Sequence, residues 1–160
     1  MSRQGLGQRV LATLAIATIA TICWLAESRA EARSTNAAEV RVSARLHLVG
    51  VSAAGIVQAG KVASAQLGNG TMTARSATTQ TTGRYRTTTR IRFGSGTLTL
   101  RGSNRVAPGR TSHQYHLAGT AKIVSGTGRF AHATGQMIVR GDGRNNLKWL
   151  NLQLRGAIHR

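Results

Sequence analysis

Hydrophobic and polar residues alternate strictly over two long stretches of this chain. In the first, from Glu39 to Val49, every second residue is apolar and the residues between are charged or polar. This period of two places the apolar side chains on one face of a β-strand and the polar ones on the other. The inward face is predicted to carry Val40, Val42, Ala44, Leu46 and Leu48, and the outward face Arg41, Ser43, Arg45 and His47.

The second alternating stretch, from Gly83 to Phe93, has the most unusual pattern. Its outward face is a row of arginines about 26 Å long, at about 3.3 Å per residue. Its inward face mixes rings with hydroxyls, which suits either a lumen that binds a small ligand or ordinary core filling. The outward residues are Arg84, Arg86, Thr88, Arg90 and Arg92, and the candidate ligand-binding residues of the inward face are Tyr85, Thr87, Thr89 and Phe93.

Turn residues divide the rest of the chain into further short strands. Turns are predicted at Gly68-Asn69-Gly70, Gly94-Ser95-Gly96, Val106-Ala107-Pro108-Gly109 and Gly141-Asp142-Gly143. The strands between them are 55–58, 61–67, 71–77, the strand with Leu98 and Leu100, 111–124, 136–140, and 147–158 with Leu150, Leu152 and Leu154 inward. About eight strands at even spacing and no helix predict an all-β fold. The chain is expected to form a single small antiparallel eight-stranded barrel, because closure removes the exposed strand edges.

The N-terminal region has the three-part pattern of a secretory signal. Arg3 and Arg9 precede an uncharged stretch from Val10 to Ala26, and small residues follow at Ala30 and Ala32. We expect a signal peptide over 1–30, cleaved near Ala30 or Ala32, a linker over 31–37 and a barrel domain over 38–160. The protein would then be secreted or periplasmic. The alternative is an uncleaved membrane anchor, since the apolar stretch is at the short end for a spanning helix. The only cysteine, Cys23, lies within this stretch.

The charge balance is extremely basic. The chain has 22 Lys and Arg residues against 4 Asp and Glu, a formal net charge of +18. Such a protein adheres to anionic polymers, and this adhesion weakens as salt rises. The arginine row of Arg84, Arg86, Arg90 and Arg92, beside Arg41 and Arg45, is the candidate anion-binding face; the alternative is a solvated basic face without a partner. No stacking aromatics accompany the arginines, so specific nucleic-acid recognition is not expected.

Few residues are suited to catalysis or metal binding. With Glu39 and Asp142 as the only acids after residue 37, no carboxylate pair for glycosidase or aspartic-protease chemistry can be assembled. His113 and His116 are three residues apart, which puts them on opposite faces of a strand, so no metal site is expected. Asp142 is predicted to serve its turn, or to accept a hydrogen bond from Arg140 or Arg144. We therefore predict no catalytic residues, no metal and no cofactor.

A glycine-rich corner follows the apolar strand that ends at Val124. The residues Ser125-Gly126-Thr127-Gly128-Arg129-Phe130 lead through Ala131, His132 and Ala133 to Gly135. Gly126 and Gly128 permit the positive φ that a tight corner needs. Phe130 is a large ring among small residues, and we expect it to plug one end of the barrel. The structural residues of this corner are Gly126, Gly128, Arg129, Phe130 and Gly135.

The corner resembles the GGTGRF-x-x-A-x-G signature of the allene oxide cyclase-like and dirigent-like β-barrels, which include small secreted bacterial members. Ser125 replaces the first glycine of that pattern, and His132 is an added polar residue. The resemblance extends best from Gly96 to the C-terminus. It implies a cofactor-free barrel that holds a hydrophobic small molecule and, in the plant members, guides cyclisation or radical coupling.

Two functional hypotheses follow. The first is a secreted, non-catalytic barrel that binds a small hydrophobic ligand in its lumen, or an anionic envelope component through its basic outer face. The second, implied by the resemblance, is a cofactor-free isomerase or cyclase of the allene oxide cyclase or dirigent type, whose lumen excludes water and sets the substrate's shape. The scarcity of carboxylates favours the first.

Overall fold

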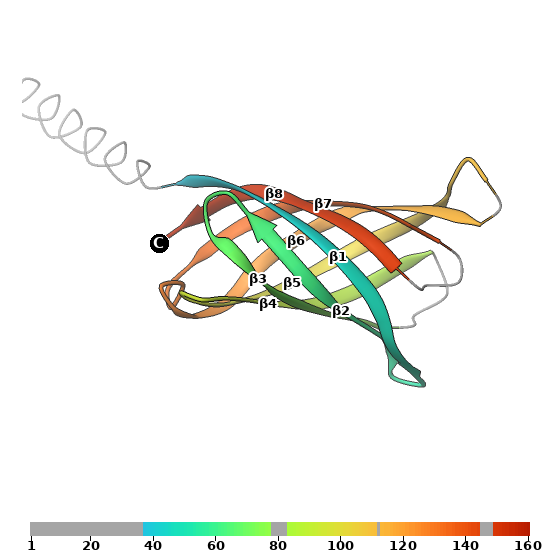
Figure 1. The fold of residues 1–160 in the computed structure, drawn as a ribbon, viewed down its shortest axis with the longest axis horizontal. Coiled ribbons are helices and arrows are strands. Elements are labelled where there is room, and N and C mark those ends of the chain that lie inside the picture. Colours follow the sequence, from blue (N-terminus) through green and yellow to red (C-terminus); the bar gives the residue numbers. More distant parts are fainter. Residues whose placement is uncertain (1–36, 78–82, 112, 145–148) are drawn as a thin grey trace, which may run out of the picture. The chain divides into compact units, whose positions relative to one another are not determined.

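The protein forms a closed barrel of eight antiparallel strands (Figure 1). The computed structural model describes residues 37–77, 83–111, 113–144 and 149–160. Each strand pairs with the next in sequence, and β1 pairs with β8 to close the barrel. This confirms the predicted fold class. The strands are β1 (Ala38–Ser52), β2 (Gly55–Ser64), β3 (Gly68–Ser76), β4 (Arg84–Phe93), β5 (Gly96–Pro108), β6 (Gln114–Gly128), β7 (Thr134–Arg144) and β8 (Trp149–His159).

The alternation of apolar and polar residues becomes the inside and outside of the barrel. On β1 the apolar positions predicted to face inward are buried from Val40 to Leu46, and the residues between them are exposed. β8 behaves in the same way, with Leu150, Leu152 and Leu154 buried. The interior is therefore one continuous hydrophobic core, made from every second residue of the eight strands.

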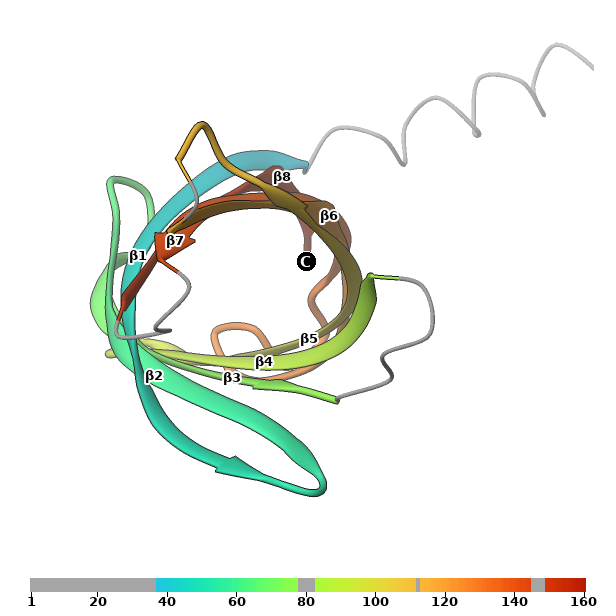
Figure 2. The same ribbon diagram turned by 90° about the vertical axis from the view of Figure 1, so that its right-hand side faces the viewer.

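One end of the barrel, the closed end, is sealed by the turn between β6 and β7. This turn projects inside the outline of the ring of strands (Figure 2), and Phe130 within it has no exposed surface. Its ring lies 6.0 Å from that of Phe93, and the guanidinium of Arg160 lies 5.6 Å from its centre. Phe130 is therefore buried at the end of the barrel where it was expected to lie.

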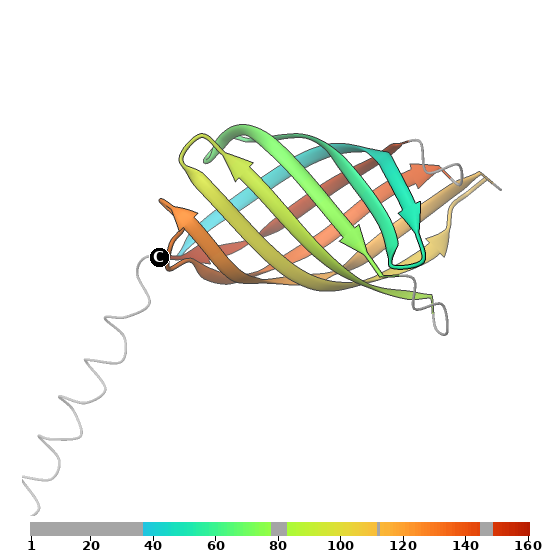
Figure 3. The same ribbon diagram turned by 90° about the horizontal axis from the view of Figure 1, so that it is seen from below.

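The other end, the open end, carries the β1–β2 hairpin and the last residues of β3, β5 and β7 (Figure 3). The hairpin leaves the ring of strands and projects outward (Figure 2). The register between β1 and β2 shifts between Leu48 and Gly50, so that Val49 is an extra residue without a partner on β2. Such a bulge bends its strand, which accounts for the departure of the hairpin from the barrel wall.

The predicted corner lies a few residues later than expected. β6 continues through Ser125 to Gly128, and the chain turns over residues 129–133. Gly128 has a positive φ of 59°, whereas Gly126 does not. A Cβ at Gly126 would overlap the carbonyl oxygen of Phe130. Gly126 is therefore needed for close approach of the turn to the strand, and only Gly128 serves the chain reversal.

Three other predicted turns are wrong. Asn69 and Gly70 lie within β3, the segment Gly141–Gly143 lies within β7, and Pro108 ends β5 instead of forming a turn. Two of these glycine signals reflect close packing: a Cβ at Gly70 would overlap the carbonyl oxygen of Arg92, and one at Gly141 would lie 2.6 Å from Leu152. The turn at Gly94 and Ser95 is where it was expected.

Other boundaries differ more modestly. The two weak strands expected at 55–58 and 61–67 are the single strand β2, with Gly60 in its middle. The strand expected from Thr111 begins at Gln114 and is continuous through Gly119. Residues 1–36, over which the signal peptide and most of the linker were predicted, lie outside the described residues. Among the described segments, none forms a helix with the length and apolarity needed to span a bilayer.

We expect Phe130→Ala to lower the free energy of unfolding by about 3–5 kcal/mol, because it removes a fully buried ring and leaves a cavity. The exposed neighbour His132 provides a matched control, and His132→Ala should change stability by less than about 0.5 kcal/mol. Urea unfolding followed by circular dichroism measures both. Equal stability of the Phe130 variant and the wild type would show that the ring does not seal the core.

Candidate functional site

The half of the lumen next to the open end is hollow, and polar side chains lie among its apolar ones. A cavity of about 270 Å³ opens there, and a narrower one of about 30 Å³ continues it toward the barrel's middle. Gln58, Ser76, Leu117 and Leu150 line both cavities, so the two form one passage. The remaining wall of the outer cavity consists of Ile56, Tyr85, Val106 and Tyr115. The passage is therefore lined by apolar groups, hydroxyls and amides, and no charged side chain is among its described lining.

Three polar side chains form a hydrogen-bonded row across β3, β4 and β5. Asn104 Nδ2 donates to Thr87 Oγ1 at 3.1 Å, and Thr87 Oγ1 lies 3.1 Å from Ser76 Oγ. Asn104 is 6% exposed, and its Oδ1 has no hydrogen-bond partner. A buried amide oxygen without a donor destabilises the folded protein, because the oxygen has lost the hydrogen bonds that it makes with water in the unfolded chain. Among the described buried side-chain atoms, this oxygen is an acceptor without a donor, and a ligand that donates a hydrogen bond would supply one.

Glycines on β6 and β7 make room for these groups. Asn104 is the register partner of Gly119, and a Cβ at Gly119 would overlap Asn104 Oδ1. Gly143 likewise lies beneath the ring of Tyr115, where a Cβ would overlap the ring. Tyr115 can therefore lie against the barrel wall at the open end. A side chain at either glycine would push a polar group further into the lumen.

Burial changes the acidity of Tyr115. Desolvation raises the pKa of its phenol above the ordinary value, and a hydrogen bond with Gln58 lowers it in part. The phenol is therefore neutral throughout the physiological range. At neutral pH it is a hydrogen-bonding group of the lumen and not a base.

The predicted lumen residues are divided by the structure. Thr87 and Thr89 line the inner cavity and Tyr85 the outer one, in agreement with their inward face. Phe93 is at the closed end, buried against Phe130, and lines neither cavity. The sequence interpretation missed the polar groups with the strongest claim to a ligand: Gln58, Ser76, Asn104 and Tyr115. Continued alternation from Leu98 and Leu100 would have placed Asn104 inside.

The arginine row on β4 faces outward, as the alternation predicts. The side chains of Arg84, Arg86, Arg90 and Arg92 are exposed. Their register partners on the adjacent strands are mostly hydroxyl residues: Ser103 for Arg86, Thr73 and Thr99 for Arg90, and Thr71 and Thr97 for Arg92. This interleaving keeps like charges apart across strands. Arg84 is the exception, since it lies opposite Arg105.

Arg41 and Arg45 do not simply extend that row. Arg41 Nη2 lies 3.6 Å from Glu39 Oε1. The same oxygen accepts a hydrogen bond of 2.6 Å from Arg155 Nε. The hydrogen bond and charge of Arg155 hold the pKa of Glu39 below its usual value, with Arg41 adding to the effect. Arg45 lies over the ring of Trp149 at 5.8 Å. Both arginines therefore have partners on β1 or β8.

Asp142 pairs with a histidine and not with arginine. It is an exposed residue within β7, and its Oδ1 lies 2.5 Å from Nδ1 of His116 on β6. The predicted turn role and the predicted bond to Arg140 or Arg144 are therefore corrected: pairing of β6 with β7 places His116 directly opposite. His113 precedes β6, so the opposite-face argument does not apply to it. Among the described residues no three His, Cys, Asp or Glu side chains gather as metal ligands.

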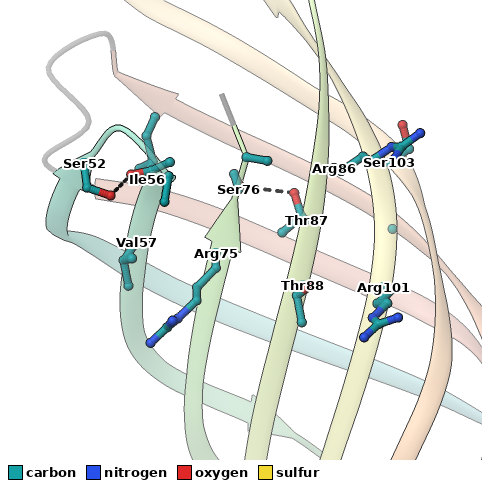
Figure 4. A pocket seen from close by; sticks show the side chains of 14 residues that line it. Ser52, Ile56, Val57, Arg75, Ser76, Arg86, Thr87, Thr88, Arg101 and Ser103 are labelled. Carbon is teal, nitrogen blue, oxygen red and sulfur yellow. Dashed lines mark hydrogen bonds between the residues drawn. The ribbon is translucent and has the colours of Figure 1, made fainter. Parts of the chain in front are cut away.

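The outer surface is hollowed beside the β1–β2 hairpin (Figure 4). This hairpin groove has a volume of about 610 Å³. Residues of the hairpin, including Ile56 and Val57, line it on one side. Arg75, Arg86 and Arg101 on β3, β4 and β5 line it on the other. Sequence reasoning identified Arg86 as part of a basic face but did not predict the groove.

Comparisons with protein-family models, with curated proteins and with solved structures found no match to this chain. The likeness to the allene oxide cyclase-like and dirigent-like barrels therefore depends on the residues of the corner alone, and membership of that family stays a prediction.

The raised pKa of Tyr115 has a measurable consequence for stability. Below the unfolded-state pKa of about 10 the phenol is protonated in both states, so its contribution is fully present. As pH rises through the higher folded-state pKa, the unfolded chain loses the proton first and this contribution to stability is lost. An alkaline titration followed by tyrosinate absorbance, compared between the wild type and Tyr115→Phe, isolates the ionisation of Tyr115. We expect this ionisation to occur above pH 10. Ionisation of Tyr115 at or below pH 10 would contradict burial of the phenol.

Proposed function

We propose that the protein is a non-catalytic barrel that binds one small, uncharged and largely apolar ligand in its lumen. The observation that carries the proposal is a cavity system open at one end, whose inner part is lined by Asn104 with its buried, unpartnered Oδ1. Ligand pockets are typically apolar with a few placed polar groups, which describes this passage. A packed core would instead leave no space, and no buried acceptor without a donor.

The charge of the ligand follows from the lining. The described residues around the two cavities include no carboxylate, guanidinium, ammonium or imidazole. A charged ligand would lose its hydration without gaining an opposite charge. The size of the outer cavity, about 270 Å³, suits a molecule of one or two rings or a short chain.

The same lining favours binding over catalysis. A cyclase or isomerase that moves protons needs a base with a pKa near the working pH. Within the described lining the ionisable groups are Tyr85 and Tyr115, and burial raises the pKa of Tyr115. The enzymatic alternative, a cofactor-free isomerase or cyclase, would therefore have to act only through the shape that the lumen imposes on its substrate. The secreted or periplasmic location predicted from residues 1–32 remains part of the proposal.

Asn104 should select ligands that donate a hydrogen bond. Naphthol and its methyl ether share one ring system, but only naphthol can donate to Asn104 Oδ1. We expect Asn104→Leu to weaken naphthol binding by about two- to tenfold, the usual value of one hydrogen bond, and to leave the ether unchanged. Probe fluorescence measures both affinities.

The outward-facing Asn151 on β8 provides the matched control, because Asn151→Leu makes the same chemical change outside the lumen. A second variant, Val106→Trp, fills the outer cavity and should abolish binding of both probes. Binding that survives Val106→Trp in a folded protein would place the ligand elsewhere and overturn the proposal. A preference for the ether would show that the amide presents its NH₂ group inward.

A further inference from the structure

The β1–β2 hairpin presents an uncharged, partly apolar tip on an otherwise strongly basic molecule. From Leu48 to Val57 the chain carries no charged residue. Val49 and Val51 are 60% and 64% exposed, and they are among the most exposed large hydrophobic residues described. The bulge at Val49 bends the hairpin away from the wall, so these side chains do not return to the core. The exposed tip is therefore built into the strand pairing.

Three guanidinium groups lie beside this tip in the hairpin groove. Arg75 and Arg101 are joined in register through Thr88, on the strand between them (Figure 4). Arg86 lines the same groove further toward the open end. Along the described residues of β2 to β6 there is no acidic side chain. The described acids are Glu39 on β1, which pairs with Arg155, and Asp142 on β7, which pairs with His116. The described lining of the groove therefore carries positive charge without an internal counter-charge.

We propose that the open end docks on an anionic lipid bilayer, with the hairpin tip in the headgroup region and Arg75, Arg86 and Arg101 binding lipid phosphates. A bilayer surface offers both things that the groove lacks: negative charge for the arginines and an apolar layer for the valines. A soluble polyanion satisfies the arginines but leaves Val49 and Val51 in water. The proposal uses residues other than Asn104 and does not depend on a lumenal ligand.

The open end is also the end at which the lumenal cavity reaches the surface. Ile56 and Ser76 line both the hairpin groove and the outer cavity. Docking in this orientation brings the mouth of the lumen to the lipid surface. An apolar ligand could then pass between bilayer and barrel with little exposure to water.

A fluorescent label that reports local polarity tests the tip directly, without interference from the apolar N-terminal stretch. The only cysteine is removed by Cys23→Ser, and an NBD label is attached at Val51→Cys in the full chain. With vesicles of phosphatidylcholine and phosphatidylglycerol we expect a blue shift and increased intensity of the label. Pure phosphatidylcholine should give neither. The same label at Gln136→Cys, exposed on β7, is the positional control and should not respond.

The arginines are tested in the Val51-labelled protein. Replacing Arg75, Arg86 and Arg101 by serine should weaken the response at least about tenfold in vesicle concentration, since each cation near an anionic surface contributes about fivefold.

A matched triple replacement of the exposed Arg92, Arg129 and Arg140 removes the same charge away from the groove and from the open end, and it should change the response much less. Circular dichroism verifies that both triple variants retain the barrel.

Three outcomes would overturn the proposal. The first is the absence of any response at residue 51 with anionic vesicles. The second is an equal response at residue 136, which would indicate non-specific adhesion. The third is a response to soluble polyphosphate as large as that to vesicles, which would assign the groove to a polymer. Each outcome leaves the naphthol measurements unaffected, so failure here and failure of the lumenal proposal are distinguishable.

Discussion

Pairing of β1 with β8 is the constraint on which the rest of the structure depends. Ten residues of β1, from Ala38 opposite Ile158 to His47 opposite Trp149, pair in unbroken register. Apolar residues therefore meet apolar ones inside, as Leu46 meets Leu150, while polar pairs alternate with them outside. A slip of one residue would turn the core of both strands to water. Closure also leaves no free edge in the barrel wall, so the molecule can be small and still expose no unpaired strand.

Within the closed wall, the filling of the lumen changes from one end to the other. Toward the closed end, Phe93, Phe130, Leu98 and Met137 belong to the hydrophobic core, and Phe130 packs against Phe93 and the guanidinium of Arg160. Toward the open end, amides and hydroxyls replace them, and glycines on β6 and β7 leave space. The packed half and the hollow half therefore share one barrel wall and one continuous set of buried residues. Such a fold tolerates an unsatisfied amide oxygen, because the free-energy cost of that oxygen is small beside the stabilisation that the buried apolar side chains provide.

The strands were predictable because alternation is a direct consequence of the β conformation. Burial along β4 follows the predicted pattern from Tyr85 to Phe93, and that along β8 from Leu150 to Leu154. The turns were less predictable, because glycine serves both chain reversal and close approach. Gly94 is used in the first way and Gly141 in the second, and the residues beside them do not distinguish the two.

The candidate site was only partly predictable for a related reason. Thr87 and Thr89 follow from alternation along their own strand. Asn104 would follow only from continuing the alternation of Leu98 and Leu100 past Gly102, because a polar residue at an inward position does not itself mark that position as buried. The hairpin groove could not be predicted, since it brings together residues of the β1–β2 hairpin, β3, β4 and β5 through the pairing of neighbouring strands and the outward bend of the hairpin. The basic charge was evident from composition, but its concentration away from both described acids was not.

One irregularity connects the lumen with the outer surface. If Val49 were paired like its neighbours, the end of β1 would continue along the wall with the other strands. With the bulge, the register passes from Leu48 opposite Gln58 to Gly50 opposite Val57, and the hairpin turns outward. Ile56 can then line the outer cavity on one side and the hairpin groove on the other. The exposed valines and the hairpin side of the arginine-lined groove therefore depend on one feature, the extra residue in β1, and Ile56 connects them to the mouth of the lumen.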